Sequence, residues 1–152
     1  MLSYNVEESE RTPADDDSPD CTGGIFSLAV MNTMSGKILQ IPFPAGFDSV
    51  LDYEFSPDDH NIAVTFGAAS CDYPGDVARV YTVSLPAIEL APVSRADRLA
   101  VQARWSPNGR AIIYQDYTGS DSPLMVFDLA TQKTSRLTSP GQLGPDNFLG
   151  WR

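Results

Sequence analysis

The chain has 152 residues, of which 42% are hydrophobic and 10% aromatic, so it can bury the core of one ordinary domain and is not expected to be disordered. Its 10 basic and 20 acidic residues give a net charge of −10, which disfavours nucleic acid and anionic membrane surfaces as partners. No run of about 18 apolar residues is present for membrane insertion, and no signal peptide is visible at the N-terminus. Twelve prolines, eleven glycines and many short alternating runs predict an all-β protein.

A first unit of strands is expected at residues 1–44. MLSYNVE, at residues 1–7, is predicted to be a strand, and a hairpin is predicted at residues 25–42 after a long loop. The unit lacks the first strand that the next two units have.

The long loop of the first unit contains an acidic run. Carboxylate oxygens are ligands that calcium uses, but the spacing here fits no EF-hand, and acidic runs beside Pro and Ser are mostly solvated. No metal and no other cofactor are therefore predicted, with calcium as the alternative. The residues concerned are Asp15, Asp16 and Asp17, followed by Asp20.

A second unit is expected at residues 47–94. Apolar residues at every second position up to Phe55 alternate with acidic residues, which is the period of a strand. The only histidine, His60, lies in the turn that follows and is expected to be solvated, because a general base needs partners that no single surface position provides. The loop after this hairpin holds a second set of weak binding candidates, namely Asp72, Tyr73 and Asp76.

A third unit, at residues 97–139, repeats the second with a shift of 50 positions. Trp105 falls on Phe55, and the sequence SPNG at residues 106–109 falls on SPDD at residues 56–59. Ser, Pro, Asn and Gly in this order suit a tight turn. Each unit therefore begins with a β-hairpin whose structural turn residues are Ser56, Pro57, Ser106, Pro107 and Gly109.

The strand before the second turn also alternates. The residues that alternate with Ala100, Gln102 and Arg104 are predicted to share one face of it, namely Leu99, Val101, Ala103 and Trp105.

A second, independent alignment gives the same repeat length. Residues 30–41 align without gaps on residues 126–137 at a shift of 96 positions, which is two repeats of about 48. Each complete unit therefore holds four strands, A to D, where A and B form the Ser-Pro hairpin and C and D form the second hairpin. Residues 146–152 are predicted to be one more strand A, with Trp151 at the position of Trp105.

Four-stranded units at this period predict β-propeller blades, about three of them in this chain. Propellers close with about four to eight blades, so three blades would leave open edges. Two explanations follow. The chain is part of a longer propeller, or a second copy of the chain completes a six-bladed ring.

Residues 103–138 resemble a blade of the TolB-like (WD-type, PD-repeat) β-propeller family. The family pattern has an aromatic-Ser-Pro-Asp-Gly turn, an apolar strand and a closing Leu-Thr. This chain departs from the pattern at Asn108 and Asp59, and Asp tolerates the left-handed conformation of the turn better than most residues. The resemblance implies the propeller fold but no activity, because this fold carries many. The matching residues are Trp105, Ser106, Pro107, Gly109, Asp128, Leu137 and Thr138.

The two cysteines, Cys21 and Cys71, lie in the loops between strands B and C of neighbouring blades. All B–C loops emerge on one face of a propeller, so a disulfide between the two is expected if their Cα atoms come within about 7 Å, with two separate thiols as the alternative. A disulfide indicates an oxidising compartment. Together with the family resemblance it favours a periplasmic or extracellular location.

Phe55, Trp105 and Trp151 are interpreted as blade-to-blade packing residues rather than as a ligand site, because they recur at one position of strand A.

No catalytic residues are predicted, because neither a G-x-S-x-G nucleophile motif nor a P-loop is present. The B–C loops are longer than hairpins need, and long loops on one propeller face are where binding usually resides. The sequence therefore predicts a non-catalytic module that binds a protein or other ligand, or serves as a scaffold, through these loops. The alternative is the propeller portion of a larger hydrolase, such as a prolyl-oligopeptidase-like serine peptidase.

Overall fold

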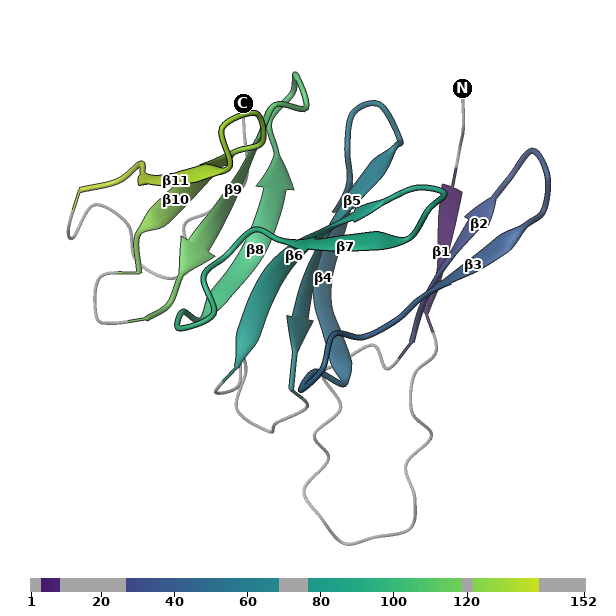
Figure 1. Cartoon of the computed structure of the whole chain (residues 1–152), viewed down its shortest axis with the longest axis horizontal. Coiled ribbons are helices and arrows are strands. Elements are labelled where there is room, and N and C mark those ends of the chain that lie inside the picture. The colour runs from purple at the N-terminus through teal and green to yellow at the C-terminus, as the bar shows by residue number, and fades with distance from the viewer. Residues whose placement is uncertain (1–3, 9–26, 69–76, 119–121, 140–152) are drawn as a thin grey trace, which may run out of the picture.

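The computed structural model describes residues 4–8, 27–68, 77–118 and 122–139. This part of the chain contains eleven strands and no helix, so the predicted all-β fold class is confirmed. The strands form three antiparallel sheets that follow one another across the molecule (Figure 1).

The first sheet has the strand order β1-β2-β3, and each strand is antiparallel to its neighbour. Its strands are β1 (Tyr4–Glu8), β2 (Leu28–Asn32) and β3 (Ile38–Ile41).

The second sheet follows the chain in the simple order β4-β5-β6-β7. It contains the first Ser-Pro hairpin as its first two strands. Its strands are β4 (Ser49–Phe55), β5 (Asn61–Gly67), β6 (Ala78–Ser84) and β7 (Glu89–Pro92).

The third sheet repeats this order, from β8 at one edge to β11 at the other. Two consecutive four-stranded antiparallel meanders are the blades that the repeat predicted. The strands are β8 (Ala100–Trp105), β9 (Ala111–Asp116), β10 (Leu124–Asp128) and β11 (Lys133–Arg136).

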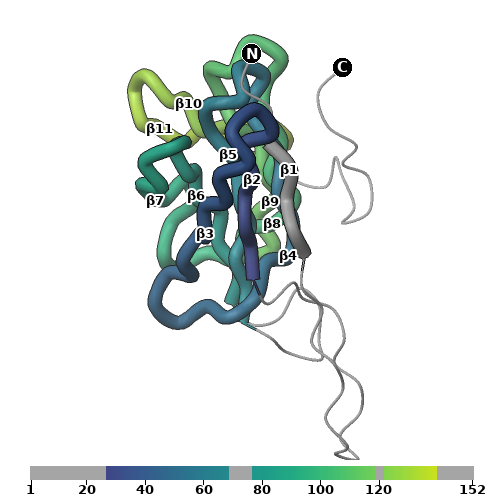
Figure 2. Tube along the Cα trace, turned by 90° about the vertical axis from the view of Figure 1, so that its right-hand side faces the viewer, coloured from purple at the N-terminus to yellow at the C-terminus, as the bar shows by residue number. Residues whose placement is uncertain are grey.

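The three sheets are stacked with corresponding strands aligned. In Figure 2 the last strands, β3, β7 and β11, lie along one side of the molecule, and the first strands β4 and β8 lie along the other. β4 and β8 are in contact with one another. This is the arrangement of propeller blades, in which strand A is innermost and strand D outermost.

The two Ser-Pro turns have the same hydrogen bonds. The Ser56 hydroxyl donates to Oδ1 of Asp58 at 2.6 Å and accepts from the backbone N–H of Asn61 at 2.9 Å. The Ser106 hydroxyl donates to Oδ1 of Asn108 at 2.9 Å and accepts from the backbone N–H of residue 111, also at 2.9 Å. A short polar side chain two residues after the serine therefore closes both turns.

Side chains on the two faces of the second sheet enter two different cores. On β5, Ile62, Val64 and Phe66 belong to a cluster shared with β2, whereas Ala63 belongs to a cluster shared with β8 and β9. Successive residues of a strand point to opposite faces, so the sheet is buried on both sides. The cores therefore lie between blades, where a propeller places them.

The alternation predicted for β8 is wrong at Val101. Between Val101 and Arg104 the register with β9 shifts, which marks a β-bulge. Val101 pairs with Gln115, whereas Trp105 pairs with Ile112, so Val101 does not share the face of Trp105. A bulge inserts one extra residue and reverses the faces beyond it, which a pattern of alternating residues cannot show.

Candidate functional site

A groove of about 430 Å³ lies at the junction of the second and third blades. It is open to solvent and combines apolar, hydroxyl and charged side chains. We call it the junction groove; its lining residues are Val77, Arg79, Ala96, Asp97, Arg98, Leu99, Tyr117 and Thr118.

Three connections between strands meet at the junction groove. Val77 directly precedes β6, and Tyr117 directly follows β9, so the groove lies where the B–C connections of both blades begin or end. The residues 96–99 belong to the linker that leads from β7 to β8. The groove is thus on the face from which the B–C loops emerge.

Hydrogen bonds from backbone N–H groups hold the wall formed by the third blade. The Tyr117 N–H donates to the Leu99 carbonyl at 2.7 Å, and the Leu99 N–H donates to Oγ1 of Thr118 at 2.7 Å. The Thr118 N–H in turn donates to Oδ1 of Asp116 at 2.8 Å. The linker and the end of β9 are therefore joined as one wall.

Arg79 forms the opposite part of the groove and bridges to the linker. Its Nη2 donates to the Ala96 carbonyl at 2.5 Å. Its guanidinium carbon lies 5.6 Å from the centre of the Phe47 ring, within the range of a cation–π contact. Within the part of the chain that the structure describes, Arg79 forms no ion pair.

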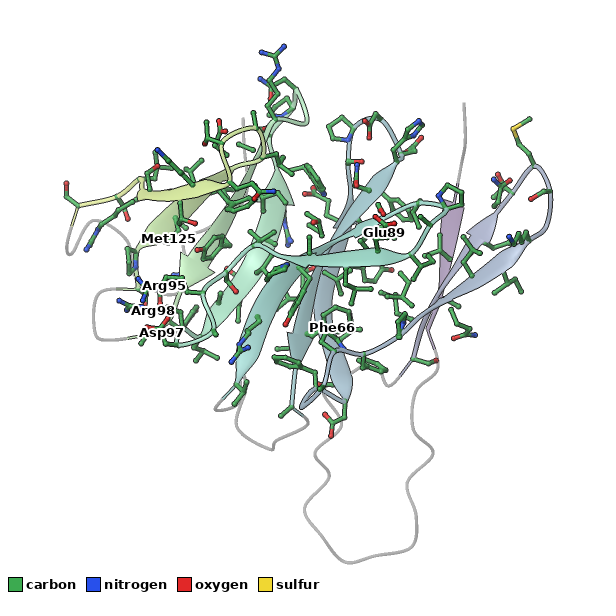
Figure 3. All side chains as sticks on the ribbon, in the orientation of Figure 1. Phe66, Glu89, Arg95, Asp97, Arg98 and Met125 are labelled. Carbon is green, nitrogen blue, oxygen red and sulfur yellow. The ribbon has the colours of Figure 1, made fainter. Side chains whose placement is uncertain are left out.

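Arg95, Asp97 and Arg98 lie together on the linker, as Figure 3 shows. Arg95 donates to both carboxylate oxygens of Asp97 at 3.0 Å, and this contact holds the pKa of Asp97 below its usual range. The Asp97 carboxylate is therefore occupied by Arg95, which itself is not part of the groove lining. Arg98 Nη1 lies 3.7 Å from Oδ2 of Asp116, which is beyond hydrogen-bond distance.

A buried tyrosine lies near these charged residues. Burial raises the pKa of the Tyr114 phenol; a hydrogen bond with Thr134 opposes this shift, and the negative charge of Asp116 adds to it. Tyr114 therefore stays a neutral phenol, and it packs in the core between the second and third blades.

The junction groove differs in charge from the protein as a whole. The chain carries a net charge of −10, whereas the described residues in or beside the groove include three of its ten basic residues, Arg79, Arg95 and Arg98, and two acidic residues, Asp97 and Asp116. The described charged residues at the groove therefore carry one net positive charge, from three arginines against two aspartates. Such a surface favours negatively charged groups at short range, where screening by salt is weakest.

A second polar cluster joins the inner strands of the same two blades. Arg104 on β8 forms an ion pair with Asp52 on β4. Glu54 on β4 accepts hydrogen bonds from Trp105 on β8. These contacts hold the third blade against the second near the Ser-Pro turns.

The acidic and cysteine candidates from the sequence lie outside the described residues. The structure consequently tests neither the binding candidates nor the disulfide. The residues outside are Asp15, Asp16, Asp17, Asp20, Cys21, Cys71, Asp72, Tyr73 and Asp76, as well as Trp151.

The aromatic residues of strand A lie between blades. Trp105 is 6% exposed and packs in the core that the second blade shares with the third. Phe55 is half-buried and packs against the core shared with the first blade. His60 is an exposed turn residue.

The sequence analysis missed the arginines of the junction groove. Arg79 and Arg98 are 19 positions apart along the chain and come together because Ser94 and Ala96 of the linker are hydrogen-bonded to Val80 and Arg79 of β6. One signal was present, namely the charged run RADR at residues 95–98 in a chain with only ten basic residues. Two arginines in a four-residue linker do not by themselves distinguish a binding surface from a solvated turn.

Within residues 4–8, 27–68, 77–118 and 122–139, no three His, Cys, Asp or Glu side chains gather closely enough to hold a metal ion. The same residues contain no helix long and apolar enough to cross a membrane.

Comparison with known proteins identifies the fold. No family model and no curated protein sequence matches the chain. Among solved structures, the tricorn protease superimposes with a TM-score of 0.57 at 16% identity over 76% of this chain and 11% of that chain. TolB from Acinetobacter baumannii superimposes with a TM-score of 0.55 at 18% identity, covering 74% of this chain and 26% of that chain.

Dipeptidyl peptidase 4 from Porphyromonas gingivalis also matches, with a TM-score of 0.51 at 18% identity over 78% of this chain and 17% of that chain. This chain thus spans about a quarter or less of each of these three proteins. The similarities confirm the predicted TolB-like propeller fold.

Proposed function

We propose that the chain is a non-catalytic β-propeller module that binds a protein or peptide on the face of its B–C loops. The junction groove carries this proposal, because it lies at the base of two B–C connections and combines apolar with charged side chains. Peptide sites commonly combine a shaped apolar surface with a few placed polar groups. The TolB-like fold is compatible with this role and with many others.

The test is a selection of random peptides displayed on phage against the immobilised chain, followed by calorimetry with the enriched peptides. Val77, 39% exposed in the groove, offers a steric block. Val77→Trp should abolish binding. Met34→Trp, at an exposed position of the turn between β2 and β3, should bind as the wild type does. No enriched peptide, or equal binding by both variants, would contradict the proposal.

The alternative is the propeller portion of a larger hydrolase. The similarity to the tricorn protease and to dipeptidyl peptidase 4 favours it, although at 16% and 18% identity that similarity concerns the fold alone. The coding sequence around this chain distinguishes the two: an adjoining α/β-hydrolase pattern with a G-x-S-x-G motif supports the hydrolase.

A second copy of the chain completing a six-bladed ring stays a prediction. Ile38, 52% exposed on β3 of the first sheet, is one apolar residue that such a partner would cover. Sedimentation equilibrium measures the mass in solution: twice the 16.5 kDa chain mass supports the ring, and a monomer at all concentrations excludes it.

A further inference from the structure

We infer that the junction groove binds a carboxylate of a peptide ligand, with the guanidinium of Arg98 as its main contact; this inference rests on the proposed function. It specifies the chemistry that the groove recognises, namely an acidic side chain next to an apolar one.

Arg98 has hydrogen-bond donors available for a ligand. Its side chain is 40% exposed, and its contact with Asp116 at 3.7 Å is electrostatic attraction without a hydrogen bond. Asp116 directs its Oδ1 to the backbone N–H of Thr118 instead. Arg98 therefore lines the groove with a planar donor group whose N–H groups no described side chain accepts.

The neighbouring charges favour a carboxylate over a cation. Among the described residues, Asp97 is the one acidic residue of the lining, and Arg95 already occupies both of its oxygens; Asp116 lies beside the groove, 3.7 Å from Arg98. Arg79 adds a second positive charge from the second blade. Guanidinium groups bind carboxylates with short, charge-assisted hydrogen bonds, often two at once.

Apolar side chains lie beside the arginine in the same groove. Val77 and Leu99 line it together with the ring of Tyr117. A small inorganic anion would use the guanidinium but leave this apolar wall unused. A peptide with an acidic residue between two aliphatic residues uses both, and we therefore favour it as the ligand.

The probe for the test is the peptide acetyl-Ala-Leu-Glu-Leu-Ala-amide, compared with the same peptide carrying Gln in place of Glu. Binding to the full chain is followed by NMR titration of the backbone amides of Val77, Leu99 and Thr118. The Glu peptide should bind about tenfold more tightly than the Gln peptide, as expected for the loss of one charge-assisted hydrogen bond. This comparison leaves the protein unchanged, so it does not depend on the folding of a variant.

Variants then assign the discrimination to Arg98. In Arg98→Gln the two peptides should bind equally, whereas Arg98→Lys should keep part of the preference because it keeps the charge. The matched control is Arg110→Gln, which removes the same charge from the Ser-Pro turn of the third blade and should discriminate as the wild type does. Equal binding of both peptides to the wild type, or equal discrimination by Arg98→Gln and Arg110→Gln, would overturn the inference.

Failure of the carboxylate inference can be distinguished from failure of the proposed function. If the displayed-peptide selection yields ligands that Val77→Trp excludes but whose binding Arg98→Gln does not weaken, the module binds peptides and the carboxylate inference alone is wrong. If the selection yields no ligand, the proposed function fails. If the Glu probe also causes no saturable shift in the groove, the carboxylate inference fails with it.

Discussion

Glu54 holds Trp105 of the next blade at two points. The indole Nε1–H of Trp105 donates to the backbone carbonyl of Glu54 at 3.0 Å, and the backbone N–H of Trp105 donates to the Glu54 carboxylate at 2.5 Å. Both residues belong to innermost strands, Glu54 to β4 and Trp105 to β8. One residue of the second blade thereby fixes both the main chain and the side chain of the residue that anchors the third.

Replacing Trp105 tests the packing between blades. Trp105→Ala removes a buried aromatic side chain and should lower the free energy of unfolding by about 3–5 kcal/mol. Urea unfolding followed by circular dichroism measures the change. Leu137→Ala is the control, because Leu137 is 55% exposed, and it should change the stability by no more than about 0.5 kcal/mol. A Trp105→Ala chain as stable as this control would contradict the assignment of Trp105 to the core.

Replacing Glu54 tests the polar contact independently of the ring. Glu54→Ala leaves the backbone N–H of Trp105 without its acceptor. It should lower the free energy of unfolding by about 1.5–3 kcal/mol, the range for hydrogen bonds to charged groups. Glu54→Gln keeps an acceptor oxygen and should cost less. Glu89→Ala on β7 removes the same charge from an exposed position and should be close to neutral. Equal unfolding free energies for the two alanine variants would show that the contact does not stabilise the protein.

The two Ser-Pro turns should differ in their response to acid. Hydrogen bonds, first from the Ser56 hydroxyl and then from the His60 N–H, hold the pKa of Asp58 below its ordinary value of 3.8. Because the folded-state pKa is the lower one, the stabilisation is fully present above pH 3.8 and is lost as the pH falls through the folded-state value. The turn of the third blade makes the matching hydrogen bonds with the neutral Asn108 and has no such dependence.

Exchanging these two residues provides the measurement. Asp58→Asn should keep its stability near pH 7 and lose less of it than the wild type below pH 3.8, and Asn108→Asp should lose more. Urea unfolding at a series of pH values gives the free energy of unfolding against pH for each protein. Differences in slope report the exchanged residue, because the other carboxylates contribute equally to all three proteins. Parallel stability curves for the three proteins would refute the role given to Asp58.

Replacing Gly109, the last residue of the turn in the third blade, tests the backbone conformation of that turn. Gly109 has a φ of +66°, and a Cβ added there would lie 3.7 Å from Cδ of Pro57, which is an ordinary contact. Gly109→Ala should therefore lower the free energy of unfolding by about 1–2 kcal/mol, because Ala disfavours the left-handed backbone conformation. Asp59 adopts a φ of 59° at the equivalent position.

Gly109→Asn is the comparison for this position, because Asn tolerates the left-handed region better than Ala. It should cost less than Gly109→Ala in the same urea unfolding measurement. If both variants were as stable as the wild type, the left-handed conformation of Gly109 would not be required for the turn of the third blade.

Much of the fold could be predicted from short stretches of sequence. The Ser-Pro hairpins were found because their turns depend on local chemistry: a hydroxyl, a fixed proline φ, a short polar side chain and a residue that accepts positive φ. These groups interact within five residues of one another, so sequence spacing is enough to show them. The repeat of these hairpins then indicated the blades.

The bulge in β8 and the contact between Glu54 and Trp105 could not be predicted in this way. The bulge was missed because alternation assumes an uninterrupted ladder, and Val101 was placed on the wrong face as a result. The two partners of the inter-blade contact are 51 positions apart in sequence, and no local pattern relates them.

Local side-chain chemistry in this sequence is sufficient to specify the strands, the turns and the repeating blade. The junction groove is different, because Val77 and Arg79 come from the second blade and Tyr117 and Thr118 follow β9 of the third. Their proximity depends on how two sheets stack, and stacking is set by a core that draws side chains from several strands of both blades. A surface assembled from such distant pieces becomes visible only once the blades are packed together.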